Sequence, residues 1–351
     1  MKIGIPKEVK VLEGRVALTP SAIRELVNQG HQVFVEENAG LLSGYPNNEY
    51  ENAGAKLLNS AKEVYQNATL IVKVKEPQEY EIKNYLRSDH ILFSFLHLAA
   101  APNLTRDLQD IGLTAVAFET VTLNKQLPLL APMSDIAGRI AVQVGTHLLH
   151  QPQQGRGILL GGVAGTEKGT VVILGGGTAG SAATHIASAL GANVIVFDPN
   201  RNKQIQLKEI GQNITALQPL EQDIERAVKE ADLLVGAVLI PGAKAPYLVS
   251  ENLVKSMKPG SVIVDISVDQ GGCIETTRPT TYDNPTFICH DVLHFGVTNM
   301  PGAVPRTSTQ ALSAVLLPYV LKLTEENWES DAALASGINL KKGEIILPTL
   351  R

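Results

Sequence analysis

Three glycines and one aspartate have the spacing of a site that holds the phosphates of a nucleotide. Gly175, Gly177 and Gly180 follow the apolar run 171–174, and Asp198 ends the next apolar run. In this pattern the first glycine permits a sharp turn, the second lets the backbone approach a pyrophosphate, and the third lets a helix pack against a strand. The carboxylate would accept hydrogen bonds from a ribose and repel a 2′-phosphate. The pattern therefore predicts a Rossmann domain that binds a dinucleotide.

The residues that follow Asp198 bear on which dinucleotide is bound. Arg201 and Lys203 lie a few positions further on, and both cations could pair with a 2′-phosphate. The sequence thus favours NAD and leaves NADP open. The other interpretation of the glycines is a tight turn between a strand and a helix that binds nothing.

Four polar residues follow other apolar runs and could act on a substrate held beside the dinucleotide. They are the cations Arg15 and Lys75, the imidazole of His97 and the carboxylate of Asp269. Taken singly, each has a more ordinary interpretation as a solvated cation, a core histidine or a turn aspartate. All four, however, follow a strand, at the edge where open α/β sheets bind their ligands. Lys73 competes with Lys75 but is expected to lie deeper along the same strand face.

The chemistry that this set could perform is hydride exchange at an amino acid. A guanidinium and an ammonium can neutralise and orient a carboxylate, and the ammonium of Lys75 can also polarise a carbonyl oxygen. Imidazole titrates near neutral pH, so His97 is expected to be the general acid and base. Asp269 could orient water or ammonia and stabilise a cationic iminium. The dinucleotide would carry the redox step, so no metal is required.

Alternating strands and helices must position these groups. Apolar runs predict strands near residues 2–5, 32–35, 70–74, 91–95, 114–118, 233–238, 262–266 and 287–289. Capping residues and helical periodicity predict helices over residues 20–30, 102–110, 134–150 and 307–324. This alternation predicts an α/β fold of two doubly wound, mostly parallel sheets separated by a cleft.

Length and composition define the class of protein. A chain of 351 residues exceeds the size at which a single core stops growing, so two domains are expected. We assign residues 1–130, with 305–351 returning to them, to a substrate domain, and residues 131–304 to the NAD domain. The net charge is −5 and the chain has no basic stripe and no long apolar stretch, which disfavours nucleic-acid and membrane partners and favours the cytoplasm.

Cysteines and paired histidines offer little support for a metal or a disulfide. Cys273 and Cys289 form no C-x-x-C pair and are expected to be reduced thiols in or near the core. His290 and His294 have a spacing that could bind zinc on a helix, but the preceding segment is predicted to be a strand and no third ligand is evident. The pair His147 and His150 is likewise expected to lie at a surface or an interface.

Six phrases, spread over nearly the whole chain, resemble the alanine dehydrogenase family. They are RVALTP at 15–20, VKVKEP at 72–77, FLHLAA at 95–100, PMS at 132–134, DQGG at 269–272 and VTNMP at 297–301. Several of these phrases are specific to that family, unlike the glycine pattern. The sequence departs from it only mildly: Asp135 stands where glutamate is common, and Pro199 and Arg201 vary the stretch after the ribose-binding acid.

The resemblance implies NAD-dependent, reversible oxidative deamination of L-alanine to pyruvate and ammonium by a homohexamer. It implies that Arg15 and Lys75 bind the substrate and that His97 and Asp269 are catalytic. Beyond the glycine turn, it implies cofactor contacts from Ser134, Thr178, Ala179, Asp198, Lys203, Val238, Leu239, Val297, Thr298, Asn299 and Met300.

Two other functions are compatible with a dinucleotide fold. The NAD-binding subunit of a proton-translocating transhydrogenase resembles alanine dehydrogenases and shares the phrase around Arg15. The phrases around Lys75, His97 and Asp269, and the lack of a membrane segment, disfavour it. A protein that only binds or senses NAD should lack a complete set of four polar residues, and this chain has all four.

Overall fold

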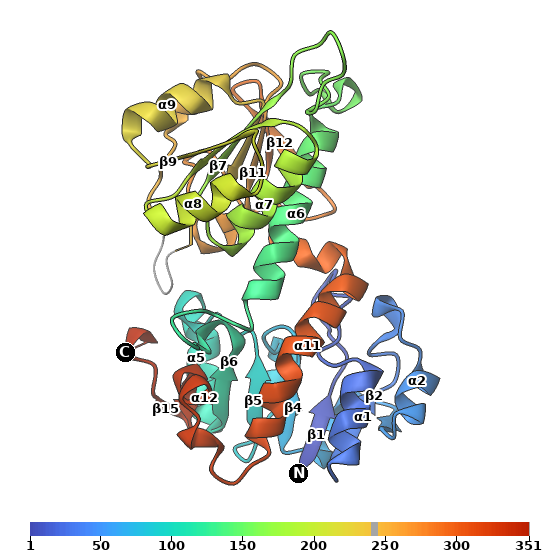
Figure 1. Ribbon diagram of the computed structural model, residues 1–351. Coiled ribbons are helices and arrows are strands. Elements are labelled where there is room, and N and C mark those ends of the chain that lie inside the picture. The colour runs from blue at the N-terminus through green and yellow to red at the C-terminus, as the bar shows by residue number, and fades with distance from the viewer. Residues whose placement is uncertain (240–244, 351) are drawn as a thin grey trace. The chain divides into compact units, whose positions relative to one another are not determined.

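The computed structural model describes residues 1–239 and 245–350, apart from the side chains of Asp269 and Gln270. The chain forms two compact units, one made of residues 1–133 with 302–351 and the other of residues 134–301. Each unit contains one sheet with helices packed against it (Figure 1). Helix α6, Ala131–Leu148, runs from the end of the first unit into the second.

The first unit has a sheet with the strand order β15-β14-β6-β5-β4-β1-β2-β3. Strands β1 to β6 pair in parallel, whereas β14 pairs antiparallel with β6 and β15 antiparallel with β14. The bounds are β1 Lys2–Ile5, β2 Gln32–Glu36, β3 Lys56–Leu58, β4 Leu70–Val72, β5 Ile91–Ser94, β6 Thr114–Ala117, β14 Ile338–Lys341 and β15 Glu344–Ile345. The order reverses between β1 and β4, and open α/β sheets bind ligands at the carboxyl ends of the strands at such a point.

The helices of the first unit cover this sheet. They are α1 Pro20–Asn28, α2 Asn47–Asn52, α3 Ala61–Asn67, α4 Glu79–Asn84, α5 Pro102–Ile111, α11 Pro305–Leu323 and α12 Ala332–Gly337. Thr19 caps α1 by accepting a hydrogen bond from the backbone N–H of Ala22, and Pro20 fits the first turn because it has no N–H to satisfy. Helices α1 and α11 lie side by side (Figure 1), so the C-terminal part of the chain completes this unit.

The second unit has a sheet with the order β12-β13-β11-β10-β7-β8-β9, in which only β12 is antiparallel to its neighbour. The bounds are β7 Thr170–Leu174, β8 Asn193–Phe197, β9 Ile214–Leu217, β10 Leu233–Gly236, β11 Val262–Asp265, β12 Thr286–Cys289 and β13 Val292–Phe295. The helices packed on it include α7 Thr178–Ala189, α8 Arg201–Glu209, α9 Glu221–Glu230 and α10 Glu251–Val254. Here the order reverses between β7 and β10.

The predicted fold class, two doubly wound and mostly parallel sheets, is confirmed. The sequence patterns do not predict β3, β9, β13, β14 or β15. Strands β3 and β9 are short edge strands with half-exposed side chains, so they lack a continuous apolar run. Strand β13 follows a two-residue turn at His290 and Asp291, whose positive φ angles of 54° and 59° are rare outside glycine.

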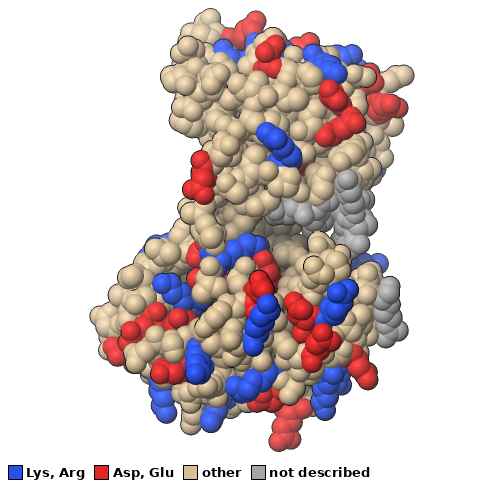
Figure 2. Space-filling model, turned by 180° about the vertical axis from the view of Figure 1, so that it is seen from behind, with Lys and Arg blue, Asp and Glu red and all other residues tan. Residues whose placement is uncertain are grey.

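Charges on the surface are mixed. On the face drawn in Figure 2, acidic and basic side chains are interspersed over both units. This distribution fits the small net charge of −5 and gives the face no strong field of one sign.

Candidate active site

The glycine turn between β7 and α7 leaves an open space in front of a helix N-terminus. Gly175 has a φ of +95°, and a Cβ atom on Gly180 would lie 1.7 Å from the carbonyl oxygen of Gly175. These two glycines are therefore required by the turn and by the close packing of α7. Gly177 is different: it is exposed, and a Cβ atom there would have nothing within 4 Å. The first N–H groups of α7 face that space, where a helix attracts negative charge.

Asp198 lies beside the same turn, at the end of β8. Its carboxylate accepts hydrogen bonds from the backbone N–H of Gly176 at 2.9 Å and of Asn200 at 2.8 Å. Asn200 in turn caps α8 by accepting from the N–H groups of Asn202 and Lys203. The acid is thus fixed between the glycine turn and α8, which is the position from which it can accept hydrogen bonds from a ribose.

The other residues of the second unit that are predicted to contact a cofactor differ in how exposed their side chains are. Thr178 and Leu239 are exposed, whereas Ser134, Ala179, Lys203, Val238, Thr298 and Asn299 are half-buried. The side chains of Val297 and Met300 are buried in the core, so only their backbone could reach a ligand. Tyr282 holds this segment by donating a hydrogen bond to the carbonyl oxygen of Met300 at 3.0 Å.

The side chain of Asp269 lies outside the described residues, and hydrogen bonds to Asp265 hold the backbone of the turn that carries it. Asp269 belongs to the 3₁₀ helix Ile266–Gln270. The buried carboxylate of Asp265 accepts from the backbone N–H groups of Ser267 at 2.9 Å and of Cys273 at 3.0 Å. Burial raises the pKa of Asp265, although these N–H groups oppose that effect. A Cβ atom on Gly236 would lie 2.7 Å from Asp265 Oδ1, so this glycine is needed to admit the carboxylate.

In the first unit, the segments that follow β1, β4 and β5 are hydrogen-bonded to one another. The backbone N–H of Val74 donates to Glu8 Oε1 at 2.5 Å, and the N–H of Phe95 donates to the carbonyl oxygen of Val74 at 3.1 Å. Because these three strands are neighbours in the sheet, Arg15, Lys75 and His97 all follow the same edge. The structure therefore gives three of the predicted substrate residues a common scaffold.

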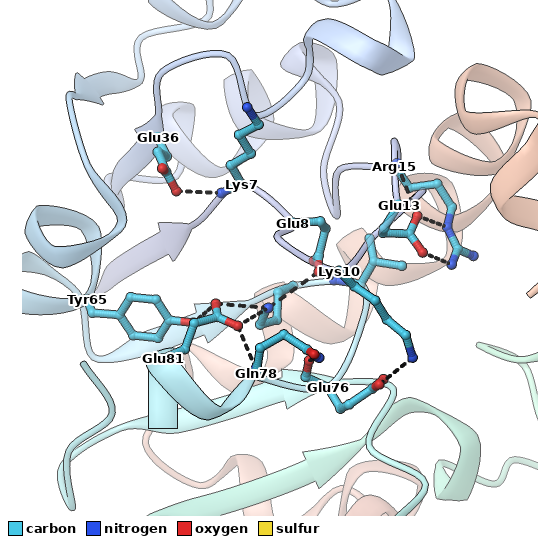
Figure 3. A network of polar contacts seen from close by, with 12 residues as sticks. Lys7, Glu8, Lys10, Glu13, Arg15, Glu36, Tyr65, Glu76, Gln78 and Glu81 are labelled. Carbon is cyan, nitrogen blue, oxygen red and sulfur yellow. Dashed lines mark hydrogen bonds and ion pairs between the residues drawn. The ribbon is translucent and has the colours of Figure 1, made fainter. Parts of the chain in front are cut away.

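Arg15 is buried and held in a fixed orientation. Its Nε donates to Glu13 Oε1 at 2.6 Å and its Nη2 pairs with Glu13 Oε2 at 2.5 Å (Figure 3). Its Nη1 contacts the sulfur of Met133 at 3.2 Å. The backbone N–H of the next residue, Val16, donates to Thr309 Oγ1 on α11 at 3.1 Å. Glu13 thus fixes the plane of the guanidinium and offsets its charge.

Lys73 is not a surface cation but the centre of a buried ionic network. Its ammonium lies 3.1 Å from both carboxylate oxygens of Glu81 and 3.4 Å from Glu8 Oε2, and Tyr65 donates to Glu81 Oε1 at 2.8 Å (Figure 3). Burial raises the pKa of Glu8 to about 6, although Lys73 opposes this effect. The expectation that Lys73 lies deeper than Lys75 agrees with its 1 % exposure. Its role is structural.

Lys75 is half-buried and lies next to a second ion pair. Glu76 accepts from Lys10 Nζ at 2.6 Å, which ties the segment after β4 to the loop after β1. Burial acts to raise the pKa of Glu76, but the hydrogen bond from Lys10 and the charge of Lys75 together lower it. Lys75 therefore stands in a segment that is fixed by hydrogen bonds and ion pairs on both sides.

His97 is exposed, and its backbone adopts a conformation that residues other than glycine rarely take. Its φ and ψ angles are 50° and 39°, in the left-handed region. Its ring is parallel to that of Phe95, with centroids 5.9 Å apart, and Phe95 packs edge-on against Phe118 at 5.0 Å. Backbone strain of this kind concentrates at functional sites, so the conformation supports the selection of His97.

The remaining histidine and cysteine residues have separate partners. His290 Nε2 lies 2.9 Å from Glu251 Oε1, whereas the buried His294 contacts Thr276 Oγ1 and the carbonyl oxygen of Val292. Both cysteines are free thiols. Among the described residues, no group of three or more histidine, cysteine or acidic side chains is arranged to hold a metal ion. Within the same residues, no helix has the length and apolar character needed to cross a bilayer.

Several residues that shape the site are not predicted from the sequence. Glu8, Glu13 and Glu119 each hold a segment that carries a predicted substrate residue, and Thr309 does so from α11. Only Glu13 offers a signal, because it stands two positions before Arg15 in the same loop. The others are brought in by the fold from distant positions.

Comparison with known proteins identifies the family to which this arrangement belongs. The N-terminal domain of the alanine dehydrogenase/PNT family matches residues 4–137, and its C-terminal domain matches residues 141–348. The chain belongs to the alanine dehydrogenase/PNT family. An alanine dehydrogenase of Bacillus subtilis is 49 % identical over 98 % of this chain and 92 % of its own length.

Solved structures of the alanine dehydrogenase/PNT family also match. An L-alanine dehydrogenase superposes with a TM-score of 0.95 at 49 % identity, covering 100 % of this chain and 98 % of its own. A transhydrogenase from Sinorhizobium meliloti superposes with a TM-score of 0.85 at 26 % identity, covering 99 % of each chain. Both branches of the family share the fold, and the alanine dehydrogenase branch is closer in sequence.

Proposed function

We propose that the protein is an NAD-dependent L-alanine dehydrogenase, which interconverts L-alanine with pyruvate and ammonium. The observation that carries the proposal is the shared scaffold of Arg15, Lys75 and His97 at one edge of the first sheet. The open glycine turn with Asp198 in the second unit supports a dinucleotide. The 49 % identity to an alanine dehydrogenase over nearly the whole chain supports the substrate.

The two cations bind and orient the carboxylate of the substrate. Arg15, whose plane is fixed by Glu13, supplies directed N–H donors, and Lys75 supplies positive charge and polarises the carbonyl oxygen of pyruvate. The residues proposed to hold NAD are Ser134, Gly175, Gly177, Thr178, Ala179, Gly180, Asp198, Lys203, Val238, Leu239, Val297, Thr298, Asn299 and Met300. When bound, NAD accepts the hydride that leaves Cα of alanine.

The protein residues then move the protons. Loss of hydride from Cα and of one proton from the ammonium nitrogen gives an iminium cation. Water attacks its carbon while His97 accepts a proton from that water, which gives a carbinolamine. His97 returns this proton to the nitrogen, the C–N bond breaks as the carbonyl forms, and the hydroxyl proton passes to the departing ammonia, which leaves as ammonium. Asp269 stabilises the cationic iminium and orients the water. The overall reaction consumes alanine, NAD⁺ and water and yields pyruvate, ammonium, NADH and a proton.

Two assays, one for each direction of the reaction, test the proposal. Purified protein with NAD and L-alanine is expected to produce NADH, seen by its absorbance, and protein with NADH, pyruvate and ammonium is expected to consume it. Glycine, L-serine and larger amino acids serve as comparison substrates. If neither direction turns over while NADH binds, the dehydrogenase proposal fails and the transhydrogenase branch becomes the better assignment. Assembly as a homohexamer is a proposal that depends on the resemblance alone.

The choice of NAD over NADP predicts the behaviour of a variant at Asp198. Asp198→Ala removes the acceptor for ribose and the repulsion of a 2′-phosphate, so NADH affinity should fall about tenfold or more while NADPH affinity does not fall. Fluorescence titration of both nucleotides measures the two constants. Asp223→Ala, which alters an acid paired with Arg226 on α9, is the control and should change neither. Equal loss of both affinities would contradict the role given to Asp198.

A further inference from the structure

A carboxylate from the neighbouring strand holds the backbone of His97. Glu119 lies on the 3₁₀ helix Phe118–Thr120, directly after β6. Its Oε1 accepts from the backbone N–H of His97 at 2.6 Å, and the N–H of Leu96 lies 3.3 Å from Oε1 and 3.2 Å from Oε2. Two consecutive N–H groups therefore point at one half-buried carboxylate. Hydrogen bonds to a charged acceptor are roughly twice as strong as those between neutral groups.

These hydrogen bonds coincide with the strained backbone at His97. A left-handed conformation is unfavourable for a residue with a side chain, so it persists only where the surroundings impose it. The N–H of Ala100 donates to the carbonyl oxygen of His97 at 3.0 Å, which closes the turn on the other side. Glu119 and this turn together determine the direction in which the imidazole leaves the backbone.

We propose that Glu119 is a positioning residue for His97. Its carboxylate keeps the backbone of residue 97 in the left-handed conformation and thereby places the imidazole for proton transfer. The inference builds on the proposed function, because it takes His97 as the general acid and base. Glu119 acts through backbone N–H groups and has no part in binding the dinucleotide, for which the residues of the second unit are proposed.

Two variants separate this role from a general contribution to folding. Glu119→Met keeps the approximate length and volume of the side chain but removes both acceptors. Glu119→Gln keeps one carbonyl oxygen, which can accept from His97 but without the charge. The matched control is Glu63→Met, because Glu63 is also a half-buried glutamate of the first unit that accepts from a backbone N–H, that of Asn59 at 3.1 Å.

The expected result is a graded loss of turnover. Glu119→Met should lower kcat about 10- to 100-fold, as misplacement of a catalytic group by a fraction of an ångström to one ångström does. The kcat of Glu119→Gln should lie between the kcat of Glu119→Met and that of the parent. The kcat of Glu63→Met should equal that of the parent. NADH affinity and the KM for pyruvate should stay within about twofold in all three, because the affected step is proton transfer.

Hydrogen exchange supplies a readout that does not depend on activity. In the parent, the backbone amides of Leu96 and His97 should be protected, and in Glu119→Met they should exchange faster than in the parent while the rest of the first unit is unchanged. Mass spectrometry of peptides that cover residues 91–100 measures this difference. Unchanged exchange at these amides would overturn the inference.

The outcomes also distinguish this inference from the proposed function. If His97→Gln abolishes turnover and Glu119→Met has full activity, Glu119 is not a positioning residue and the proposed function stands. If His97→Gln is fully active, the catalytic assignment itself fails. Equal losses of kcat in Glu119→Met and Glu63→Met would show a general structural effect and overturn the role of Glu119.

Discussion

Replacing His97 by glutamine is expected to lower kcat about 100- to 10,000-fold in both directions, which is the range for loss of a general acid or base. Glutamine has hydrogen-bonding capacity but cannot take up or release a proton near neutral pH. The affinity for NADH should not change, because the residues proposed to bind it belong to the second unit. Steady-state kinetics with pyruvate, ammonium and NADH, together with a fluorescence titration, measure both quantities.

The control for this substitution is His31→Gln. His31 is a half-buried histidine of the first unit that interacts with the N-terminal amine, 3.3 Å away, and with Thr324. It has no proposed role in the reaction, so its replacement should leave kcat unchanged. A His97→Gln enzyme with kcat within about threefold of the parent would remove His97 from the mechanism, given the size of effect expected for general acid–base catalysis.

The second large effect is expected from Lys73→Met, and it is an effect on stability. The substitution leaves Glu8 and Glu81 buried without their cation, at 6 % and 2 % exposure. Breaking a buried ion pair by removing one partner costs about 3–5 kcal/mol, so the free energy of unfolding should fall by that amount. Urea denaturation followed by circular dichroism measures the change. The Lys73→Met variant should lose activity only where it unfolds. At temperatures where it is folded, its activity should match that of the parent.

Lys83→Met is the matched control for Lys73→Met. Lys83 is also a lysine paired with a glutamate, Glu79 of the same helix, but both side chains are mostly exposed. Water solvates the glutamate left behind, so the unfolding transition should be nearly unchanged. The double variant Lys73→Met with Glu81→Gln should recover part of the stability, because one of the stranded charges is removed. A Lys73→Met protein as stable as the parent would contradict the role given to this network.

The parts of the molecule that depend on local sequence could be predicted well. The glycine turn follows from residues 170–198 alone, because the strand, the turn, the helix and the acid are consecutive and each needs only its neighbours. Helix α1 is similar, since Thr19 and Pro20 define its start within three residues. The deeper position of Lys73 relative to Lys75 could also be predicted, because residues two apart on a strand share a face and lie at different depths.

The contacts that connect distant segments could not be predicted in the same way. Glu119 meets the backbone of His97 only because β5 and β6 are neighbours in the sheet, and no motif links the two residues. The burial of Lys73 depends on Glu8 and Glu81, which come from two other segments. Thr309 reaches the loop of Arg15 from α11, nearly three hundred positions further along the chain. Such partners are decided by tertiary packing rather than by local pattern.

The pairing of β14 with β6 has a consequence for protein synthesis. Strand β6 is flanked by β5 on one side, and its other edge is covered only when Ile338 pairs with Val116. A ribosome that adds about 5–20 residues per second needs on the order of ten seconds or more to pass from one strand to the other. Throughout that interval the nascent chain carries an open, apolar strand edge, which is a template for pairing with other chains. The risk of misassembly is therefore greatest during synthesis, before β14 has been made. Within this interval the whole of the second unit is synthesised.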